Sequence, residues 1–152
     1  MAYSIQTICS AVRGQFVAQY ANNDIDSLVY DSRRIIQPSS SLFFALKTAH
    51  NDGHKYLLSA YKKGVRNFIV SDRQANELAN VNIILVEDTL AALQELASFH
   101  RGHFSFPVIG ITGSNGKTIV KEWLNHLLEK DHNIVRSPKS FNSQIGVPLS
   151  VW

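Results

Sequence analysis

The sequence contains a single cysteine, Cys9, among its 152 residues. One cysteine cannot form an internal disulfide, which excludes a disulfide-stabilised secreted domain and is typical of a reducing compartment. Cys9 falls within an apolar helical pattern, so we interpret it as a buried packing residue rather than a nucleophile.

Long apolar runs are also missing. No stretch is long enough to span a bilayer, and the residues after Met1 lack the charged start and apolar centre of a signal peptide. These two absences predict a cytoplasmic protein with no membrane partner.

Charge is sparse and evenly spread. Charged residues make up 18% of the chain, the formal net charge is +3, and no run of basic residues stands out. Nucleic-acid binding favours a clustered basic face, so we expect no nucleic-acid partner, whereas a modest basic balance suits anionic small molecules. With 45% hydrophobic residues, the chain can form one globular domain plus part of another.

Strand-like segments alternate with helical patterns, which predicts an α/β architecture. Ser4 is the expected cap of a first helix that Gly14 closes, and Asp88 or Thr89 is the expected cap of a helix that ends near Arg101. The other expected strands lie at 25–31, 42–46, 66–70, 83–86, 108–112 and 133–136, and the other expected helices at 54–63, 72–78, 117–129 and 147–152.

The segment Gly102–Pro107 is the best candidate for a domain boundary because it contains Gly, Ser and Pro. We expect residues 1–102 to form a small α/β domain and residues 103–152 to begin a second domain that the chain does not finish. His100 and His103 flank this boundary without the spacing of metal ligands, so we interpret both as solvated surface residues.

A glycine-rich turn follows the boundary, between the apolar segment 108–112 and a helical pattern. Glycines permit positive φ angles and let backbone N–H groups approach an anion, and the following helix N-terminus adds partial positive charge. The pattern predicts an ATP-binding phosphate loop that consists of Gly113, Ser114, Asn115, Gly116, Lys117, Thr118 and Ile119.

Two residues of this loop are the expected catalytic groups. Lys117 is expected to reach the β- and γ-phosphates of ATP, and the hydroxyl of Thr118 to ligate Mg²⁺. The glycine spacing is shorter than in the common P-loop, because Ile111 stands where that pattern has its first glycine. No later strand candidate ends in an acidic residue that could be a second Mg²⁺ ligand.

The short loop resembles that of the Mur ligases and of the folylpolyglutamate synthetases. In the synthetases it typically lies near the chain start, whereas about 110 residues precede it here. The segments Asp31-Ser32-Arg33, Leu42–Leu46 and Asp52-Gly53-His54 resemble the N-terminal domain of Mur ligases that add the third residue or the terminal dipeptide. The segment Phe141–Pro148 resembles a MurF-type segment that reads Asn-Asn-Glu-Ile-Gly-Val-Pro.

Three positions depart from that family pattern. Ile119 stands where a second Thr is usual, and Ser143 and Gln144 replace the usual Asn and Glu. This variant resembles the MurF modules that some bacteria fuse to a C-terminal alanine racemase, which would lie beyond this chain.

The resemblance implies an ATP-dependent ligase of peptidoglycan precursor synthesis. Such an enzyme joins D-alanyl-D-alanine to UDP-N-acetylmuramoyl-tripeptide through an acyl phosphate, with ATP and Mg²⁺ as cofactors. The resemblance also implies a set of contacts to the UDP substrate from Ser32, Arg33, Lys47, Thr48, His50, Asp52, Gly53, His54, Asn142 and Ser143.

Two alternatives stay open. A MurE-type ligase, which adds the third peptide residue, shares the Asp-Ser-Arg and Asp-Gly features, although the Ile-Gly-Val-Pro segment argues against it. A non-catalytic module that binds a UDP-sugar or a nucleotide would use the loop for binding alone. We expect the chain to be the N-terminal part of a longer enzyme and to ligate nothing by itself.

Overall fold

The structure is a computed structural model that describes residues 1–48, 51–72, 78–138 and 141–152. Its strands are β1 (Tyr3–Ser4), β2 (Gln15–Ala18), β3 (Asp24–Ile25), β4 (Ser27–Val29), β5 (Ser41–Phe44), β6 (Asn67–Val70) and β7 (Asn82–Leu85). Its helices are α1 (Ile5–Ala11), α2 (Leu57–Lys62), α3 (Thr89–Arg101), α4 (Lys117–Leu128) and α5 (Gly146–Val151), with 3-10 turns η1 (Ser32–Arg34), η2 (Pro38–Ser40) and η3 (Gly53–Tyr56).

A mixed sheet with the strand order β2-β7-β6-β5-β4 forms the centre of the fold, which confirms the predicted α/β class. Neighbouring strands from β4 to β7 are parallel, whereas β2 pairs antiparallel with β7 at the edge. Strands β1 and β3 form a separate antiparallel pair. The carboxyl ends of four parallel strands therefore lie along one edge of the sheet.

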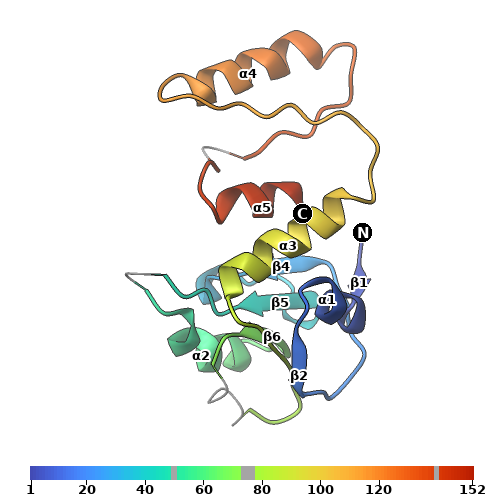
Figure 1. The fold of residues 1–152 in the computed structure, drawn as a ribbon, viewed down its shortest axis with the longest axis vertical. Helices are drawn as coiled ribbons and strands as arrows, with labels where there is room; N and C mark the ends of the chain where they lie inside the picture. Colours follow the sequence, from blue (N-terminus) through green and yellow to red (C-terminus); the bar gives the residue numbers. More distant parts are fainter. Residues whose placement is uncertain (49–50, 73–77, 139–140) are drawn as a thin grey trace.

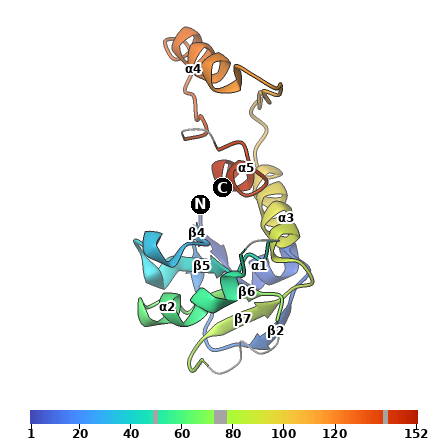
Figure 2. The same cartoon turned by 90° about the vertical axis from the view of Figure 1, so that its left-hand side faces the viewer.

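Helices cover both faces of this sheet, with α1 and α3 on one side and α2 on the other (Figure 2). All four residues of β5 are buried, because Leu42 and Phe44 pack toward α1 and α3 while Phe43 packs toward α2. A parallel strand that is covered on both faces reads as a continuous apolar run, which is why the segment 42–46 was recognisable in the sequence.

The two capped helices form as the sequence predicts. The Ser4 hydroxyl accepts a hydrogen bond from the Thr7 amide at 3.2 Å, at the start of α1. The Asp88 carboxylate accepts from the Leu90 and Ala91 amides at 2.7 and 3.2 Å, at the start of α3. Such caps satisfy amide groups that have no partner within the helix.

The C-terminal part of the chain leaves this compact unit and returns to it. Helix α4 lies away from the sheet at the end of an irregular segment, and α5 comes back to pack along α3 (Figure 1). The final residue, Trp152, donates from its indole Nε1 to the Asp26 carbonyl at 3.1 Å. The chain end is thereby hydrogen-bonded to the first unit.

Two strands predicted for this C-terminal part are wrong, because residues 108–112 and 133–136 are irregular. A strand needs a neighbour for its N–H and C=O groups, and no described segment pairs with either stretch. Val108 and Ile109 are accordingly 60% and 65% exposed. Helix α4, predicted at 117–129, forms at Lys117–Leu128 but buries none of its residues.

Other predicted elements form, but with different bounds or as two shorter elements. The helix predicted at 54–63 is split into η3 and α2, and the strand predicted at 25–31 is split into β3 and β4. The helix predicted at 72–78 lies almost wholly outside the described residues. Across the described part of the chain, no helix is both long and apolar enough to cross a membrane.

Candidate functional site

The first candidate site lies at the carboxyl edge of the parallel strands. The turn η1 follows β4, the loop 47–54 follows β5, and Thr89 with its neighbours follows β7. In open α/β sheets this edge is where ligands bind. The sheet therefore brings together the two segments that the sequence predicted as UDP-substrate contacts, although they lie far apart in the chain.

Arg33 is the most exposed cation of η1 and is held by its neighbour Asp31. Its Nε and NH2 atoms donate to Asp31 Oδ1 and Oδ2 at 2.9 and 2.8 Å, while its amide caps the turn on Oδ1 at 3.0 Å. The Arg33 side-chain bonds, followed by the amide bond, lower the pKa of Asp31 to about 2. The Arg33 side chain is 87% exposed, so it presents a cation to solvent while Asp31 holds it in place.

Ser32 is buried, and its hydrogen bonds hold η1 against α2. Its hydroxyl accepts from the Ser59 hydroxyl at 3.3 Å, and its carbonyl accepts from Lys63 Nζ at 2.7 Å. The side chain that the sequence assigned to the UDP substrate therefore already has a partner within the protein. In this arrangement its main contribution is to position Arg33.

The loop 47–54 is tied at both of its ends. The Lys47 amide donates to Thr89 Oγ1 at 3.2 Å, and the same hydroxyl donates to the Ala45 carbonyl at 3.1 Å. Within the loop, Thr48 Oγ1 accepts from the Asn51 amide at 3.1 Å. His50, which was also predicted as a contact, lies outside the described residues.

His54 has a partner on each ring nitrogen. Its Nε2 accepts from the Ser71 amide at 3.0 Å, so Nδ1 carries the proton and donates to Asp52 Oδ1 at 2.6 Å. The His54 amide and then its ring hold the pKa of the Asp52 carboxyl below its usual value. His54 thus connects the loop after β5 to the end of β6. Gly53, which lies between Asp52 and His54, donates its amide to the Leu46 carbonyl at 2.8 Å.

The second candidate site is the loop Gly113–Thr118 at the start of α4. Gly113 and Gly116 have φ angles of +144° and +78°, a region that favours glycine, as the sequence predicts. A Cβ atom at Gly116 would meet nothing within 4 Å, so its backbone conformation, not space, calls for glycine. The Lys117 ammonium folds back and donates to the Gly113 carbonyl and, at 3.4 Å, to the Ser114 carbonyl.

This loop has the features that a nucleotide phosphate requires. No acidic residue lies in the first turn of α4, and no side chain caps it, so its amide groups and its dipole are available to an anion. Ser114, Asn115, Thr118 and Ile119 are all exposed. The described residues contain no cluster of three His, Cys, Asp or Glu that could hold a metal.

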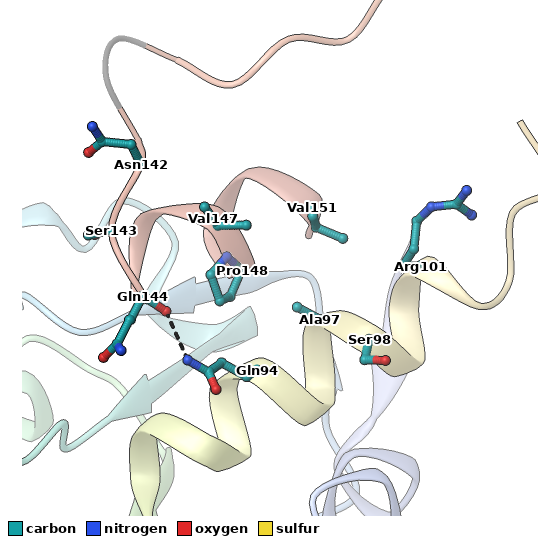
Figure 3. A pocket seen from close by; sticks show the side chains of 10 residues that line it. All are labelled: Gln94, Ala97, Ser98, Arg101, Asn142, Ser143, Gln144, Val147, Pro148 and Val151. Carbon is teal, nitrogen blue, oxygen red and sulfur yellow. Dashed lines mark hydrogen bonds between the residues drawn. The ribbon is translucent and has the colours of Figure 1, made fainter. Parts of the chain in front are cut away.

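Asn142 and Ser143 lie in a third place, an open groove between α3 and α5 (Figure 3). The groove has a volume of about 520 Å³, and Gln94 and Ser98 contribute to its α3 side. The Ser143 hydroxyl accepts from the Gly146 amide at 2.9 Å and so fixes the turn that leads into α5. The residues that line this groove do not include the loops at 31–34 and 47–54, so the structure separates these two predicted contacts from the others.

The packing around the segment Ile145–Pro148 explains why these residue types stand there. A Cβ atom on Gly146 would lie 3.0 Å from Phe141 Cα, so any side chain at this position would force Phe141 to move by a few tenths of an ångström. Ile145 packs against the main core, and Pro148 is buried within α5.

The prediction that His100 is a solvated residue is wrong. The His100 side chain is buried, and its Nδ1 lies 3.0 Å from the Tyr3 hydroxyl. The Trp152 ring lies 5.0 Å from the His100 ring and 5.4 Å from the Tyr3 ring, between centroids. Sequence reasoning missed this cluster because its members lie at the two chain ends and in α3.

We expect this histidine to make stability depend on pH. Burial, followed by the positive N-terminus and His103, lowers the pKa of His100 from 6.5. The unfolded chain then binds the proton at a higher pH than the folded chain, so the free energy of unfolding falls as the pH drops below about 6.5 through the lower, folded-state pKa. Urea unfolding between pH 7 and pH 5 should show a shallower dependence for His100→Gln than for the wild type.

His132, an exposed histidine that follows α4, is the control for the removal of one histidine. The comparison of interest is whether His132→Gln leaves the dependence on pH closer to the wild type than His100→Gln does. The same dependence in His100→Gln and in the wild type would show that His100 does not cause it.

Similarity to known proteins extends along almost the whole chain. Residues 24–101 match the family described as Mur ligase family, catalytic domain. The UDP-N-acetylmuramoyl-tripeptide–D-alanyl-D-alanine ligase of Bacillus subtilis is 34% identical over 149 residues, which are 97% of this chain and 32% of that protein. The UDP-N-acetylmuramoyl-L-alanyl-D-glutamate–2,6-diaminopimelate ligase of Caldanaerobacter subterraneus is 37% identical over 127 residues, which are 82% of this chain and 26% of that protein.

Solved structures agree with these sequence matches. MurF from Acinetobacter baumannii superposes with a TM-score of 0.88 at 27% identity, over 99% of this chain and 33% of that one. MurF from Thermotoga maritima in complex with ADP superposes with a TM-score of 0.70 at 32% identity, over 82% of this chain and 28% of that one. The chain thus spans about a third of the length of the curated relatives it matches.

Proposed function

Because the chain belongs to the Mur ligase family, we propose that it is part of an ATP-dependent ligase that joins D-alanyl-D-alanine to UDP-N-acetylmuramoyl-tripeptide. The observation that carries this proposal is the extent of the similarity. The match to the Bacillus subtilis D-alanyl-D-alanine ligase covers 97% of this chain, whereas the match to the Caldanaerobacter subterraneus 2,6-diaminopimelate ligase covers 82%. The reaction belongs to peptidoglycan precursor synthesis in the cytoplasm.

The proposal assigns a role to each of the two parts of the chain. Residues 1–102 form the domain that binds the UDP portion of the substrate, and residues 103–152 begin the domain that binds ATP. The ADP complex of a related MurF supports the use of ATP. A C-terminal alanine racemase, as in the fused enzymes that the chain resembles, would belong to the longer protein.

The phosphate loop would hold the triphosphate of ATP. Its exposed backbone, its left-handed glycines and the acid-free start of α4 suit an anion, and Lys117 would exchange the loop carbonyls for phosphate oxygens. Thr118 would provide the hydroxyl ligand of Mg²⁺. ATP bound in this way would pass its γ-phosphoryl group to the substrate carboxylate, which would give an acyl phosphate and ADP. The amine of D-alanyl-D-alanine would then displace inorganic phosphate from the acyl phosphate and form the amide bond.

The UDP portion would bind at the carboxyl edge of the sheet. Arg33 offers a planar guanidinium that suits bidentate contact with a phosphate, and Asp31 holds it in place. Lys47, Thr48, Asp52, Gly53 and His54 would shape the same edge, together with His50. Asn142 and Ser143 would meet a more distant part of the substrate, because they line the groove along α3.

Arg33→Ala tests the first of these assignments. Loss of one charge-assisted phosphate contact should weaken the binding of UMP and of UDP-N-acetylmuramoyl-tripeptide by about tenfold. Isothermal titration calorimetry of the 152-residue chain measures this directly. Arg13→Ala, an exposed arginine after α1, is the control and should bind like the wild type.

Two outcomes would contradict the assignment. Unchanged binding of the UDP ligands to Arg33→Ala would remove Arg33 from the site. Binding of Mg-ATP without any binding of UDP ligands would show that the first domain has been misassigned. In a longer protein that contains this chain, phosphate release with UDP-dipeptide and 2,6-diaminopimelate alone would favour the MurE-type alternative.

A further inference from the structure

The linker Gly102–Pro107, which the sequence predicts as a domain boundary, folds back onto the end of α3. The amides of residues 102–104 donate to carbonyls of residues 98–101 at 3.0–3.2 Å. From residue 105 to residue 115, no backbone amide donates to another backbone group within the described part of the chain. Backbone hydrogen bonds therefore do not fix the path of the linker beyond Phe104.

Arg101, the last residue of α3, reaches over this linker. Its NH1 atom donates to the Phe104 carbonyl at 2.5 Å, and its NH2 atom donates to the Phe106 carbonyl at 2.9 Å. Its Cζ atom lies 5.2 Å from the centroid of the Phe106 ring, within the range of a cation–π contact. Figure 3 shows the side chain extending from the end of α3, away from Gln94 and Gln144. One guanidinium group thus holds the linker at two carbonyls and one ring.

No carboxylate competes for this guanidinium group, since Arg101 forms no ion pair in the part of the chain that the structure describes. The planar group has several donors in a fixed arrangement, so it can bind two carbonyls at once. The linker is also packed through its rings. The Phe104 ring lies 5.0 Å from the His100 ring and 5.1 Å from the Phe106 ring, between centroids.

We infer that Arg101 is a positioning residue for the proposed ligation. It fixes the direction in which the chain leaves the UDP-binding part, and with it the place of the phosphate loop relative to the carboxyl edge of the sheet. The inference rests on the proposed function, in which the UDP substrate and ATP bind to different parts of one chain. Arg101 acts through the linker and not on a substrate. A displacement of about 1 Å between reacting groups can lower a rate by about 100-fold.

Cleavage by chymotrypsin, which cuts after phenylalanine, tests the contact between Arg101 and the linker without any ligand. In the 152-residue chain, cleavage after Phe104 and Phe106 should be about fivefold faster for Arg101→Ala than for the wild type, because the linker opens more often. Arg101→Lys should be intermediate, since an ammonium group keeps the charge but not the planar arrangement of donors. Cleavage of Arg101→Ala at the wild-type rate would overturn the inference.

Arg66→Ala is the matched control. Like Arg101, Arg66 is half-buried and uses its guanidinium group on two carbonyls, those of Tyr61 and Val65, at 2.9 and 2.8 Å. Its Cζ atom lies 4.3 Å from the Tyr61 ring centroid. The control variant therefore loses the same kinds of contact between α2 and β6, and cleavage of the linker should stay at the wild-type rate. Equal acceleration in both variants would mean that a general loss of stability exposes the linker, which would overturn the inference.

Steady-state kinetics of a longer protein that contains this chain test the role in ligation. Arg101→Ala should lower kcat by about tenfold, while the KM values for UDP-N-acetylmuramoyl-tripeptide and ATP change by less than about twofold, because each substrate binds within one part. Arg101→Lys should recover part of the lost kcat, and Arg66→Ala should keep the wild-type kcat. A higher KM with an unchanged kcat would overturn the inference.

The two experiments separate this inference from the proposed function. Faster cleavage of Arg101→Ala, together with no ligation by the longer wild-type protein, would contradict the proposed function and, with it, the role of Arg101 in ligation. Ligation by the longer wild-type protein and by Arg101→Ala at the same kcat would support the proposed function and overturn the inference alone.

Discussion

Replacing Lys117 with alanine is expected to lower the rate of ligation by about 100-fold or more in a longer polypeptide that contains this chain. The reason is electrostatic, since the ammonium group is the one cation of the loop Gly113–Thr118 and charge on the transferred phosphoryl group must be neutralised. In the structure this group already lies within the loop, on the Gly113 and Ser114 carbonyls.

Phosphate release with UDP-N-acetylmuramoyl-tripeptide, D-alanyl-D-alanine and Mg-ATP measures this effect. Lys130→Ala, which changes an exposed lysine after α4, is the matched control and should keep wild-type activity. Lys117 contacts only exposed loop carbonyls, so its removal should leave thermal unfolding of the 152-residue chain nearly unchanged. Wild-type turnover by Lys117→Ala would remove the lysine from the proposed mechanism and favour a loop that binds without catalysis.

Replacing Gly53 with alanine is expected to destabilise the chain by about 2–3 kcal/mol or more. A Cβ atom there would lie 2.6 Å from the Leu46 amide nitrogen and 2.8 Å from the Ala45 carbonyl carbon, both of which are backbone atoms at the end of β5. The backbone can relieve this overlap only by moving the loop 47–54 away from the strand. The change should therefore also weaken the binding of UDP ligands.

Urea unfolding monitored by circular dichroism measures the loss of stability. Gly110→Ala is the matched control, because a Cβ atom at Gly110 would meet no atom within 4 Å and its φ is not positive. It should shift the free energy of unfolding by less than about 0.5 kcal/mol. Equal stability of Gly53→Ala and Gly110→Ala would mean that the loop tolerates displacement, and the proposed role of its geometry would be wrong.

The elements that the sequence predicted well are those whose signals are local. Helix α3 begins after the Asp88 cap and ends at Arg101, as its apolar spacing and its cap indicated. Strand β5 is recognisable because both of its faces are buried, and the glycines at 113 and 116 adopt the positive φ angles that their position suggested. In each case the residue types within a short segment are enough to predict the local conformation.

The candidate site was predictable in part for the same reason. The motifs at 31–33 and 52–54 lie in two loops at the same edge of the sheet, but they did not reveal the partners of their side chains. Ser32 is buried against Ser59, and His54 bonds to Ser71, and both contacts depend on how elements pack.

Short-range sterics and hydrogen bonds account for the capped ends of α1 and α3, the buried strand β5 and the left-handed glycines of the loop 113–118, so local sequence patterns were enough to predict them. Packing between distant segments pairs Gln15–Ala18 antiparallel with β7 and buries His100 beside Tyr3 and Trp152. It also decided that residues 108–112 stay irregular, because a strand forms only where a neighbour satisfies its backbone groups. Such pairings join residues that are distant in the chain, and no local pattern encodes them.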